Sequence, residues 1–194
     1  HQLDFKPNPI TDGSRARPPF SSDGRMVVGA TESGTILVYD VASGALVGEH
    51  ANAQDVYKHP VFVPGSRHIF AGGDRGAYLL DAESGEQLRV FETPDNVLLS
   101  PYSDLVAVSH DGRYGAMHVE TEDSRHVVNL WDLETGDLVF QSAPHPINFV
   151  LAFAFSEDGS TFAWGGTDNI VYVLELRSME EVARLSHLDS VHQI

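Results

Sequence analysis

The sequence predicts an all-β protein that consists of four repeated units, each formed by four short antiparallel strands. Two observations carry this prediction. In residues 35–50 an apolar run is followed by an Asp, a short turn with a Gly and a second apolar run, and the same pattern returns in residues 77–92. Another Gly-containing turn precedes this pattern in every copy at nearly constant spacing, and such self-similarity marks a repeat architecture.

The repeated acid sets the register of the four units. A third copy surrounds Trp131, and a weaker fourth copy occupies residues 170–187. In that fourth copy a Glu replaces the Asp, and Met179 replaces the turn Gly. The aligned acids, in chain order, are Asp40, Asp81, Asp132 and Glu175.

The upstream turn lies at a fixed distance from the acid in three of the four units. The spacing is 17 residues from Asp23 to Asp40, from Pro64 to Asp81 and from Asp158 to Glu175. In the third unit it is 21 residues, from Asp111 to Asp132, and the four extra residues fall in residues 118–128. We therefore expect an enlarged loop before Trp131.

Four strands are expected in each unit, and in the first unit they are residues 17–21, 26–31, 35–41 and 45–49. Val, Ile and aromatic residues fill them, and Gly, Asp, Ser or Pro separates them. Asp-Gly and Ser-Gly turns suit tight hairpins, because Gly adopts positive φ without steric cost. Residues 178–185 have a helix-like Ser-x-x-Glu pattern, but the repeat predicts a fourth strand there, since neighbouring strands override local propensity.

The repeat also predicts how the chain is divided. The units are expected at about 15–50, 51–92, 97–142 and 145–187, residues 188–194 look like the first strand of a next unit, and residues 1–14 look like a lead-in strand or loop.

The repeat resembles the WD-repeat β-propellers, in a degenerate form closer to bacterial propellers than to the strict eukaryotic repeat. The residues that carry the resemblance are Tyr39-Asp40, Leu80-Asp81 and Trp131-Asp132, together with the turns before them. The resemblance implies four-stranded blades packed around a central channel. In the family a His and an Asp join a hydrogen-bond network inside each blade. Here the matching positions are His50 and His187 for the His, and Asp74 and Asp168 for the Asp.

The number of units raises the question of ring closure. A seven-bladed ring of this repeat needs about 290 residues, and an open stack would leave apolar faces and strand edges in water. Three arrangements remain open: part of a larger propeller, which is the leading interpretation, a ring completed by a second chain, and a small four- or five-bladed ring.

Composition narrows the classes of partner. The chain has 28 acidic and 12 basic residues and a formal charge of -16, so it repels nucleic acid and anionic membrane surfaces, and no apolar run is long enough to span a bilayer. A charged partner would therefore be basic. The chain has no cysteine, which excludes disulfides and thiolate metal sites and is compatible with either redox compartment.

The leading functional prediction is a non-enzymatic scaffold that displays an acidic loop face to a protein or peptide and needs no cofactor. The resemblance implies that binding uses the loops that join strand four to strand one and strand two to strand three, since function resides in loops carried by the fold. On those loops the expected partner-binding residues are Glu32, Asp55, Asp74, Arg75, Asp95, Glu122, Asp123, His126, Asp168 and Asn169. The alternative is that these acids only form turns and keep the protein in solution.

Two alternatives stay open beside this prediction. One is a propeller enzyme or cofactor-binding module of the quinoprotein type, although no cluster of basic or aromatic residues points to it. The other is a divalent-metal site. The weak candidate ligands are His118, Glu120, Glu122 and His126, with His126 and Glu122 expected in the enlarged loop. Solvated loop residues explain that cluster equally well.

Overall fold

All regular elements in the described part of the chain are β-strands. A computed structural model of the chain describes residues 20–52, 55–73, 75–93, 105–120, 125–144 and 150–189. These ranges contain no helix with the length and hydropathy that crossing a membrane requires. The strands are β1 (Met26–Ala30), β2 (Ile36–Asp40), β3 (Leu46–His50), β4 (Lys58–Phe62), β5 (His68–Gly73), β6 (Gly76–Asp81), β7 (Gln87–Glu92), β8 (Val106–Val108), β9 (Tyr114–Glu120), β10 (His126–Asp132), β11 (Leu138–Gln141), β12 (Val150–Phe155), β13 (Thr161–Gly166), β14 (Ile170–Glu175) and β15 (Glu180–Ser186).

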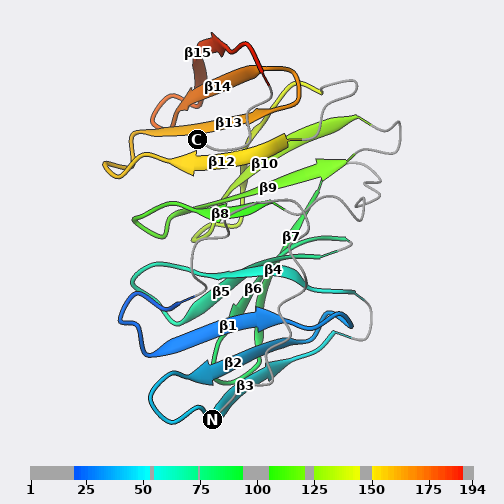
Figure 1. Cartoon of the computed structure of the whole chain (residues 1–194), viewed down its shortest axis with the longest axis vertical. Helices are drawn as coiled ribbons and strands as arrows, with labels where there is room; N and C mark the ends of the chain where they lie inside the picture. Colours follow the sequence, from blue (N-terminus) through cyan, green and yellow to red (C-terminus); the bar gives the residue numbers. More distant parts are fainter. Residues whose placement is uncertain are drawn as a thin grey trace.

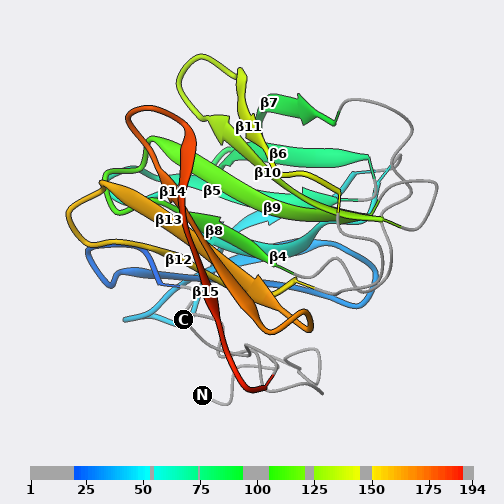
Figure 2. The ribbon, with the colours of Figure 1, turned by 90° about the horizontal axis from the view of Figure 1, so that it is seen from above.

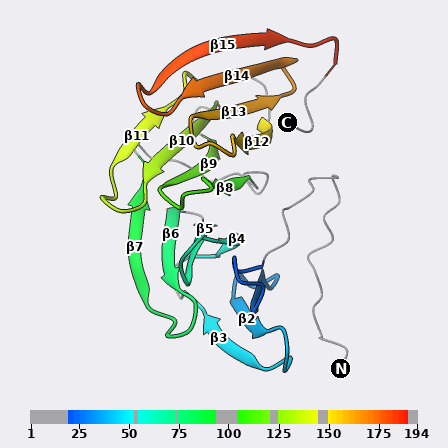
Figure 3. The same ribbon diagram turned by 90° about the vertical axis from the view of Figure 1, so that its left-hand side faces the viewer.

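The strands form four antiparallel sheets, which confirms the predicted fold class. Blade 2 is β4–β7, blade 3 is β8–β11 and blade 4 is β12–β15, each with its strands paired in chain order. Blade 1 contains β1–β3, and an isolated bridge from Phe20 to Val27 stands where the other blades have a first strand. The predicted strand at 178–185 is confirmed by β15. Figure 3 shows the four sheets fanned in chain order, with β3, β7, β11 and β15 along the outer side.

A Ser-x-Asp-Gly turn joins the first two strand positions in blades 1, 3 and 4. In blade 1 the Ser21 hydroxyl donates to Asp23 at 2.7 Å and accepts the backbone N–H of Met26 at 2.9 Å. Ser109 and Ser156 make the same two bonds in blades 3 and 4. These bonds satisfy the backbone of the tight turn, and they explain why the Asp-Gly pair recurs in the sequence.

Blade 2 builds this turn differently, which corrects the alignment inferred from spacing. Ser66 N–H donates to the Val63 carbonyl at 3.2 Å, and Gly65 has a φ of 72°. Pro followed by a positive-φ Gly is the type II arrangement. The backbone N–H of Val63 donates to the His68 carbonyl, and in blade 1 the backbone N–H of Ser21 donates to the Met26 carbonyl. Val63 is therefore equivalent to Ser21, and Pro64 is equivalent to Ser22. The spacing of 17 residues is equal in blades 1 and 2, but its starting points are not equivalent.

The repeat acid caps the turn between the third and fourth strands. Asp132 Oδ1 accepts the N–H groups of Glu134 at 3.0 Å and Thr135 at 3.1 Å, and Asp132 Oδ2 accepts Nε of Arg113 at 3.0 Å. Asp81 has the same arrangement with residues 83 and 84 and with Arg67. The Asp of the Trp131-Asp132 pair is therefore a structural residue. Met179 takes the turn position of Gly136, as the sequence alignment predicted, and it has a φ of 56°.

Apolar side chains fill the space between neighbouring blades. Because successive residues of a strand point to opposite faces, Ile69 packs toward blade 1 and Phe70 toward blade 3. Trp131 lies 6.5 Å from Phe70 and 6.0 Å from Phe91 between ring centroids, so it belongs to the core between blades 2 and 3.

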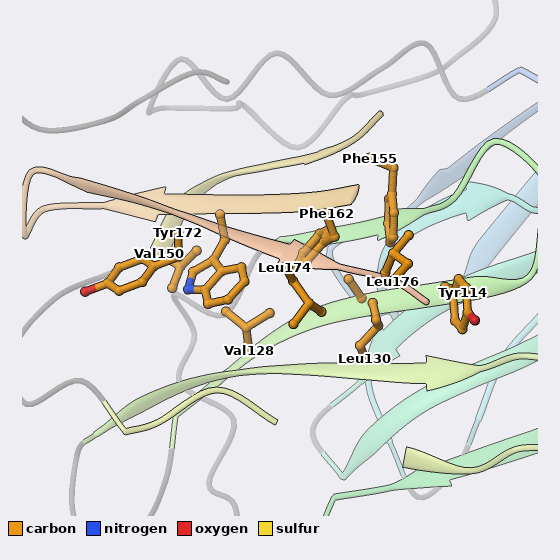
Figure 4. Packing of buried hydrophobic residues seen from close by; sticks show 11 residues of the cluster. Tyr114, Val128, Leu130, Val150, Phe155, Phe162, Tyr172, Leu174 and Leu176 are labelled. Carbon is orange, nitrogen blue, oxygen red and sulfur yellow. The ribbon is translucent and has the colours of Figure 1, made fainter. Parts of the chain in front are cut away.

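The core between blades 3 and 4 contains the second tryptophan. Trp164 stacks on Tyr172 with ring centroids 5.3 Å apart and lies 5.6 Å from Phe140 of blade 3. Figure 4 shows the layer of side chains from the two sheets, among them Leu130 and Leu174. Figure 2, which looks down the stack, shows β12–β15 lying over β8–β11.

Polar and backbone contacts also join neighbouring blades at their outer strands. Arg89 of β7 donates to the carbonyls of Thr135 at 2.6 Å and Glu134 at 3.1 Å, in the β10–β11 turn of blade 3. Between blades 1 and 2, a Cβ on Gly48 would lie 2.1 Å from the Ala82 carbonyl oxygen. In blades 2 and 3 the β-hairpin turn that follows the repeat acid thus packs on the outer strand of the preceding blade.

Candidate functional site

The stack has two edges, because all four sheets run in the same sense. The loop edge contains the segments that join second to third strands and one blade to the next: in the described ranges these are residues 31–35, 51–52, 55–57, 75, 93, 105, 125, 142–144, 167–169 and 187–189. The turn edge contains the hairpin turns at residues 21–25, 41–45, 63–67, 82–86, 109–113, 133–137, 156–160 and 176–179. In Figure 1 the turn edge lies on the left and the loop edge on the right.

Asp55, one of the residues expected to bind a partner, is buried at the loop edge. It is 8% exposed, its Oδ2 accepts the Tyr78 hydroxyl and, at 3.1 Å, the N–H of Arg75, and its Oδ1 accepts the N–H of Val56 at 2.8 Å. Burial and this carboxylate raise the pKa of Tyr78. Asp55 therefore fixes the loop onto β6, and we assign it to the fold and not to the surface.

Asp168 and Asn169 have a comparable role in blade 4. Asp168 Oδ2 accepts the Tyr172 hydroxyl at 2.8 Å, and its Oδ1 accepts the N–H of Ile170 at 3.2 Å. Burial, and secondly the bond to Asp168, raise the pKa of Tyr172 to about 12. Asn169 has a φ of 64°, a conformation that Asn tolerates better than most residues, and its carbonyl accepts the N–H of His187 at 2.7 Å. Both residues hold the turn in place.

Two residues of the predicted partner-binding face are exposed in the described part of the chain. Glu32 is exposed in the β1–β2 turn, and Arg75 is exposed at the start of the β5–β6 hairpin. The turn around Glu32 is fixed by the bond from Thr35 N–H to Thr31 Oγ1 at 3.0 Å. The remaining predicted residues, Asp74, Asp95, Glu122 and Asp123, lie outside the described residues.

The weak metal candidates include two histidines that the structure brings together. His118 and His126 are 0% and 5% exposed, and His118 Nε2 lies 3.0 Å from His126 Nδ1. The prediction that His126 lies in the enlarged loop was wrong, because it is the first residue of β10 and pairs with Glu120 of β9. The strands β9 and β10 have seven residues each, against six each in β13 and β14, so two of the four extra residues lie in the strands.

This histidine contact is a feature that sequence reasoning missed. Only the register of β9 against β10, in which Val128 faces His118 and His126 faces Glu120, places the two rings on the same face of the sheet. Over the described ranges, no three His, Cys, Asp or Glu residues are grouped as a metal ion would require.

The two histidines matched to the family's blade-internal network differ from that expectation. His50 is 3% exposed and packs beside Gly48 and Gly85, but its ring nitrogens have no hydrogen-bond partner among the described residues. His187 has an exposed side chain, and it contacts the turn at Asn169 through its backbone. Of the two matched acids, Asp168 bonds to a tyrosine inside its blade.

The described residues thus define consecutive blades of the β-propeller type, with structural acids inside the blades and a loop edge anchored by Asp–Tyr bonds. No family model matches the chain. It is 29% identical over 168 residues to autophagy-related protein 16 of Arabidopsis thaliana. The aligned region covers 81% of this chain and 29% of that protein.

Two further relatives carry one name. The chain is 27% identical over 159 residues to eukaryotic translation initiation factor 3 subunit I of Drosophila grimshawi, covering 76% of the chain and 47% of that protein. It is 28% identical over 177 residues to the protein of the same name from Bombyx mori, and the aligned region covers 84% of this chain and 51% of that protein. The chain therefore spans about half or less of the relatives' length. These distant relatives are WD-repeat proteins, and they support the WD-repeat resemblance.

Proposed function

We propose that this chain acts as a β-propeller scaffold for protein interactions and that its loop edge docks a protein or peptide partner. Exposed Glu32 and Arg75, with Asp74, Asp95, Glu122 and Asp123, make up the proposed docking face. The observation that carries the proposal is the anchoring of the loop edge: the Asp55–Tyr78 and Asp168–Tyr172 bonds hold loops in fixed positions on a packed stack. Binding residues on loops held by a rigid scaffold are a common arrangement.

The sign of the charge supports a basic partner. The chain carries a formal charge of -16, and a field of that sign attracts cationic segments and repels nucleic acid. The relatives' names describe an autophagy-related protein and a subunit of an initiation factor, and neither name describes an enzyme. A non-enzymatic scaffold, part of a larger protein assembly, agrees with both observations.

The test separates a specific face from bulk charge. One variant carries Glu32→Lys, Asp95→Lys, Glu122→Lys and Asp123→Lys at the loop edge. Its matched control carries Glu83→Lys, Glu134→Lys, Asp137→Lys and Glu157→Lys at the turn edge, where all four acids are exposed. Binding of a fluorescent Arg- and Lys-rich peptide is measured by anisotropy. We expect the loop-edge variant to lose binding and the control to keep most of it. Equal losses would mean that the peptide senses only net charge, and the proposed face would be rejected.

We further propose that more blades, from the same polypeptide or from a second chain, pack on the outward faces of blades 1 and 4. Strand alternation turns Leu37 of β2 and Val173 of β14 away from the described cores, and both are only partly buried. Solution mass by light scattering tests the second-chain version. A monomer that keeps a cooperative unfolding transition at low concentration would exclude completion by a second copy.

A further inference from the structure

Blade 1 lacks an ion pair that blades 2 and 3 both contain. Arg67 Nε lies 2.9 Å from Asp81 Oδ2, and Arg113 Nε lies 3.0 Å from Asp132 Oδ2. The equivalent residue in blade 1 is Arg25, because it precedes the residue that pairs with the repeat acid in all three blades. Arg25 is exposed, and in the described part of the chain it forms no ion pair.

The repeat acid of blade 1, Asp40, accepts hydrogen bonds from described residues on only one of its two carboxylate oxygens. Asp40 Oδ1 accepts the N–H of Ser43 at 2.8 Å and the Ser43 hydroxyl at 2.6 Å. Its Oδ2, which in the other two blades receives the arginine, accepts no hydrogen bond from any described residue. The bonds from Ser43, and secondly the charge of nearby Arg25, hold the pKa of Asp40 below its usual value, so the carboxylate is ionised near neutral pH. Blade 1 thus presents a cation and a carboxylate oxygen that are not bonded to each other.

Both groups line a cleft at the turn edge between blades 1 and 2. The cavity has a volume of about 720 Å³, and its lining includes Arg25, Asp40 and Val47 from blade 1, and Arg67 and Glu83 from blade 2. This volume lies within the range of about 300–1,000 Å³ for sites that bind small ligands. The bond from Gly65 N–H to Ser22 Oγ, at 3.0 Å, joins the two blades beside it.

The next seam along the stack is closed at the same level. A Cβ on Gly112 of blade 3 would lie 2.8 Å from the Pro64 carbonyl oxygen, so the hairpin turns of blades 2 and 3 are in direct contact there. Between blades 1 and 2 the Gly65 N–H to Ser22 Oγ bond joins the hairpin turns, but a Cβ on Gly65 would meet no atom within 4 Å. The cleft lies beside the blade in which the internal ion pair is missing.

We propose that this cleft binds a short peptide segment in which an acidic and a basic side chain lie next to each other. The ligand carboxylate pairs with the Arg25 guanidinium, whose planar fork suits two parallel hydrogen bonds. The ligand ammonium or guanidinium donates to Asp40 Oδ2. Val47 and the partly buried Met26 offer apolar surface for the methylene stem of the basic side chain. The cleft lies on the turn edge and the proposed docking face lies on the loop edge, so binding at the cleft can be tested independently of the proposed function.

The chemistry of the lining favours a ligand that carries both signs. Arg67 is already bonded to Asp81 and lies 3.7 Å from Glu83, and Asp23 accepts bonds from Ser21 and from the N–H of residue 25. The groups left for a ligand are one cation, Arg25, and three carboxylate oxygens that accept no bond from a described residue, which are Asp40 Oδ2, Asp23 Oδ2 and Glu83 Oε1. A purely anionic segment would leave the carboxylate oxygens unpaired, and a purely cationic one would leave Arg25 unpaired.

The test uses capped tetrapeptides and the whole chain. The probe is acetyl-Gly-Glu-Lys-Gly-amide, with the reversed Lys-Glu peptide, a Gln-Gln peptide and a Glu-Gln peptide beside it, and binding is followed by amide NMR shifts and calorimetry. We expect the Glu-Lys or Lys-Glu peptide to shift resonances of residues 21–25 and 65–67. Arg25→Gln and Asp40→Asn should each weaken this binding about threefold to tenfold.

The matched control is Arg113→Gln, which removes the equivalent arginine where it is already paired, and it should leave the affinity unchanged. The Glu32→Lys, Asp95→Lys, Glu122→Lys and Asp123→Lys variant of the loop edge should also bind the peptide normally, which separates this site from the proposed function. The proposal is overturned by absence of shifts up to millimolar peptide, by equal binding of the Gln-Gln or Glu-Gln peptide, or by an equal loss in Arg113→Gln.

Discussion

Gly34 is the position at which one methyl group should most clearly disturb the packing of blade 1 on blade 2. It lies in the β1–β2 turn with a φ of 79°, and a Cβ there would lie 2.5 Å from Val56 Cγ1, 2.8 Å from Val56 Cα and 2.9 Å from Tyr57 N. Two of these three atoms are backbone, so they cannot rotate away. Gly34→Ala should therefore displace the segment that carries Asp55.

The magnitude follows from two separate costs. An L-residue in the left-handed region costs about 1–2 kcal/mol, and roughly 0.4–1 kcal/mol of this is offset because Ala restricts the unfolded chain. Overpacking against backbone adds about 1–3 kcal/mol. We expect Gly34→Ala to lower the free energy of unfolding by about 2–4 kcal/mol. The control is Gly24→Ala, with a φ of 69° and no atom within 4 Å of the added Cβ, which should cost only about 1 kcal/mol.

Urea unfolding followed by tryptophan fluorescence measures both variants, because Trp131 and Trp164 are each 1% exposed in the folded chain. The two midpoints should differ while the slopes stay equal. If Gly34→Ala and Gly24→Ala unfold at the same urea concentration, the contact between the β1–β2 turn and residues 56–57 is not a packing constraint, and the reasoning fails.

Four further outcomes are expected. Trp131→Leu, which copies the Leu80 position of blade 2, should lower the free energy of unfolding by about 2–4 kcal/mol in the same urea assay, because Trp131 packs on Phe70 and Phe91. Arg89→Ala removes two charge-assisted bonds to the carbonyls of residues 134 and 135 and should cost about 1–3 kcal/mol; Arg89→Lys should recover only part of this loss, and full recovery would contradict a two-point contact. Arg113→Gln should cost no more than about 1 kcal/mol, because the arginine side chain is 58% exposed and its ion pair is screened. Burial raises the pKa of Asp132, but the bonds from Thr135, Arg113 and Glu134 outweigh it and hold that pKa below its usual value. The stability that this group contributes is therefore present above about pH 4 and is lost as the pH falls through the lowered pKa. The urea midpoints of wild type and Asp132→Asn should converge on acidification, and a constant gap from about pH 6 to about pH 3 would refute this role.

Local turn chemistry explains why so much of the fold is predictable. The Ser-x-Asp-Gly turns and the acid that caps the next turn form within a few residues, so a repeat in the sequence implies a repeat in the hairpins. The same locality explains the strand assignment of residues 180–186, because the pairing partner β14 directly precedes them. The alignment failed only where Pro64-Gly65 substitutes one turn type for another.

The candidate site was less predictable, because its residues act through partners far apart in the chain. Asp55 meets Tyr78 across 23 positions, and this contact changes Asp55 from a surface acid into a buried anchor. Glu32 and Arg75, in contrast, are exposed as expected, because tight turns at a sheet edge face solvent.

The sequence by itself determined the repeat, the four-stranded unit and the place of each capping acid, since these depend on interactions between residues close in the chain. The tertiary structure alone decided that His118 and His126 touch, that Asp55 holds a loop, and that Arg25 and Asp40 line an open cleft. These features depend on strand register and on the distance between neighbouring blades, and the packing of the apolar layers between the sheets sets both.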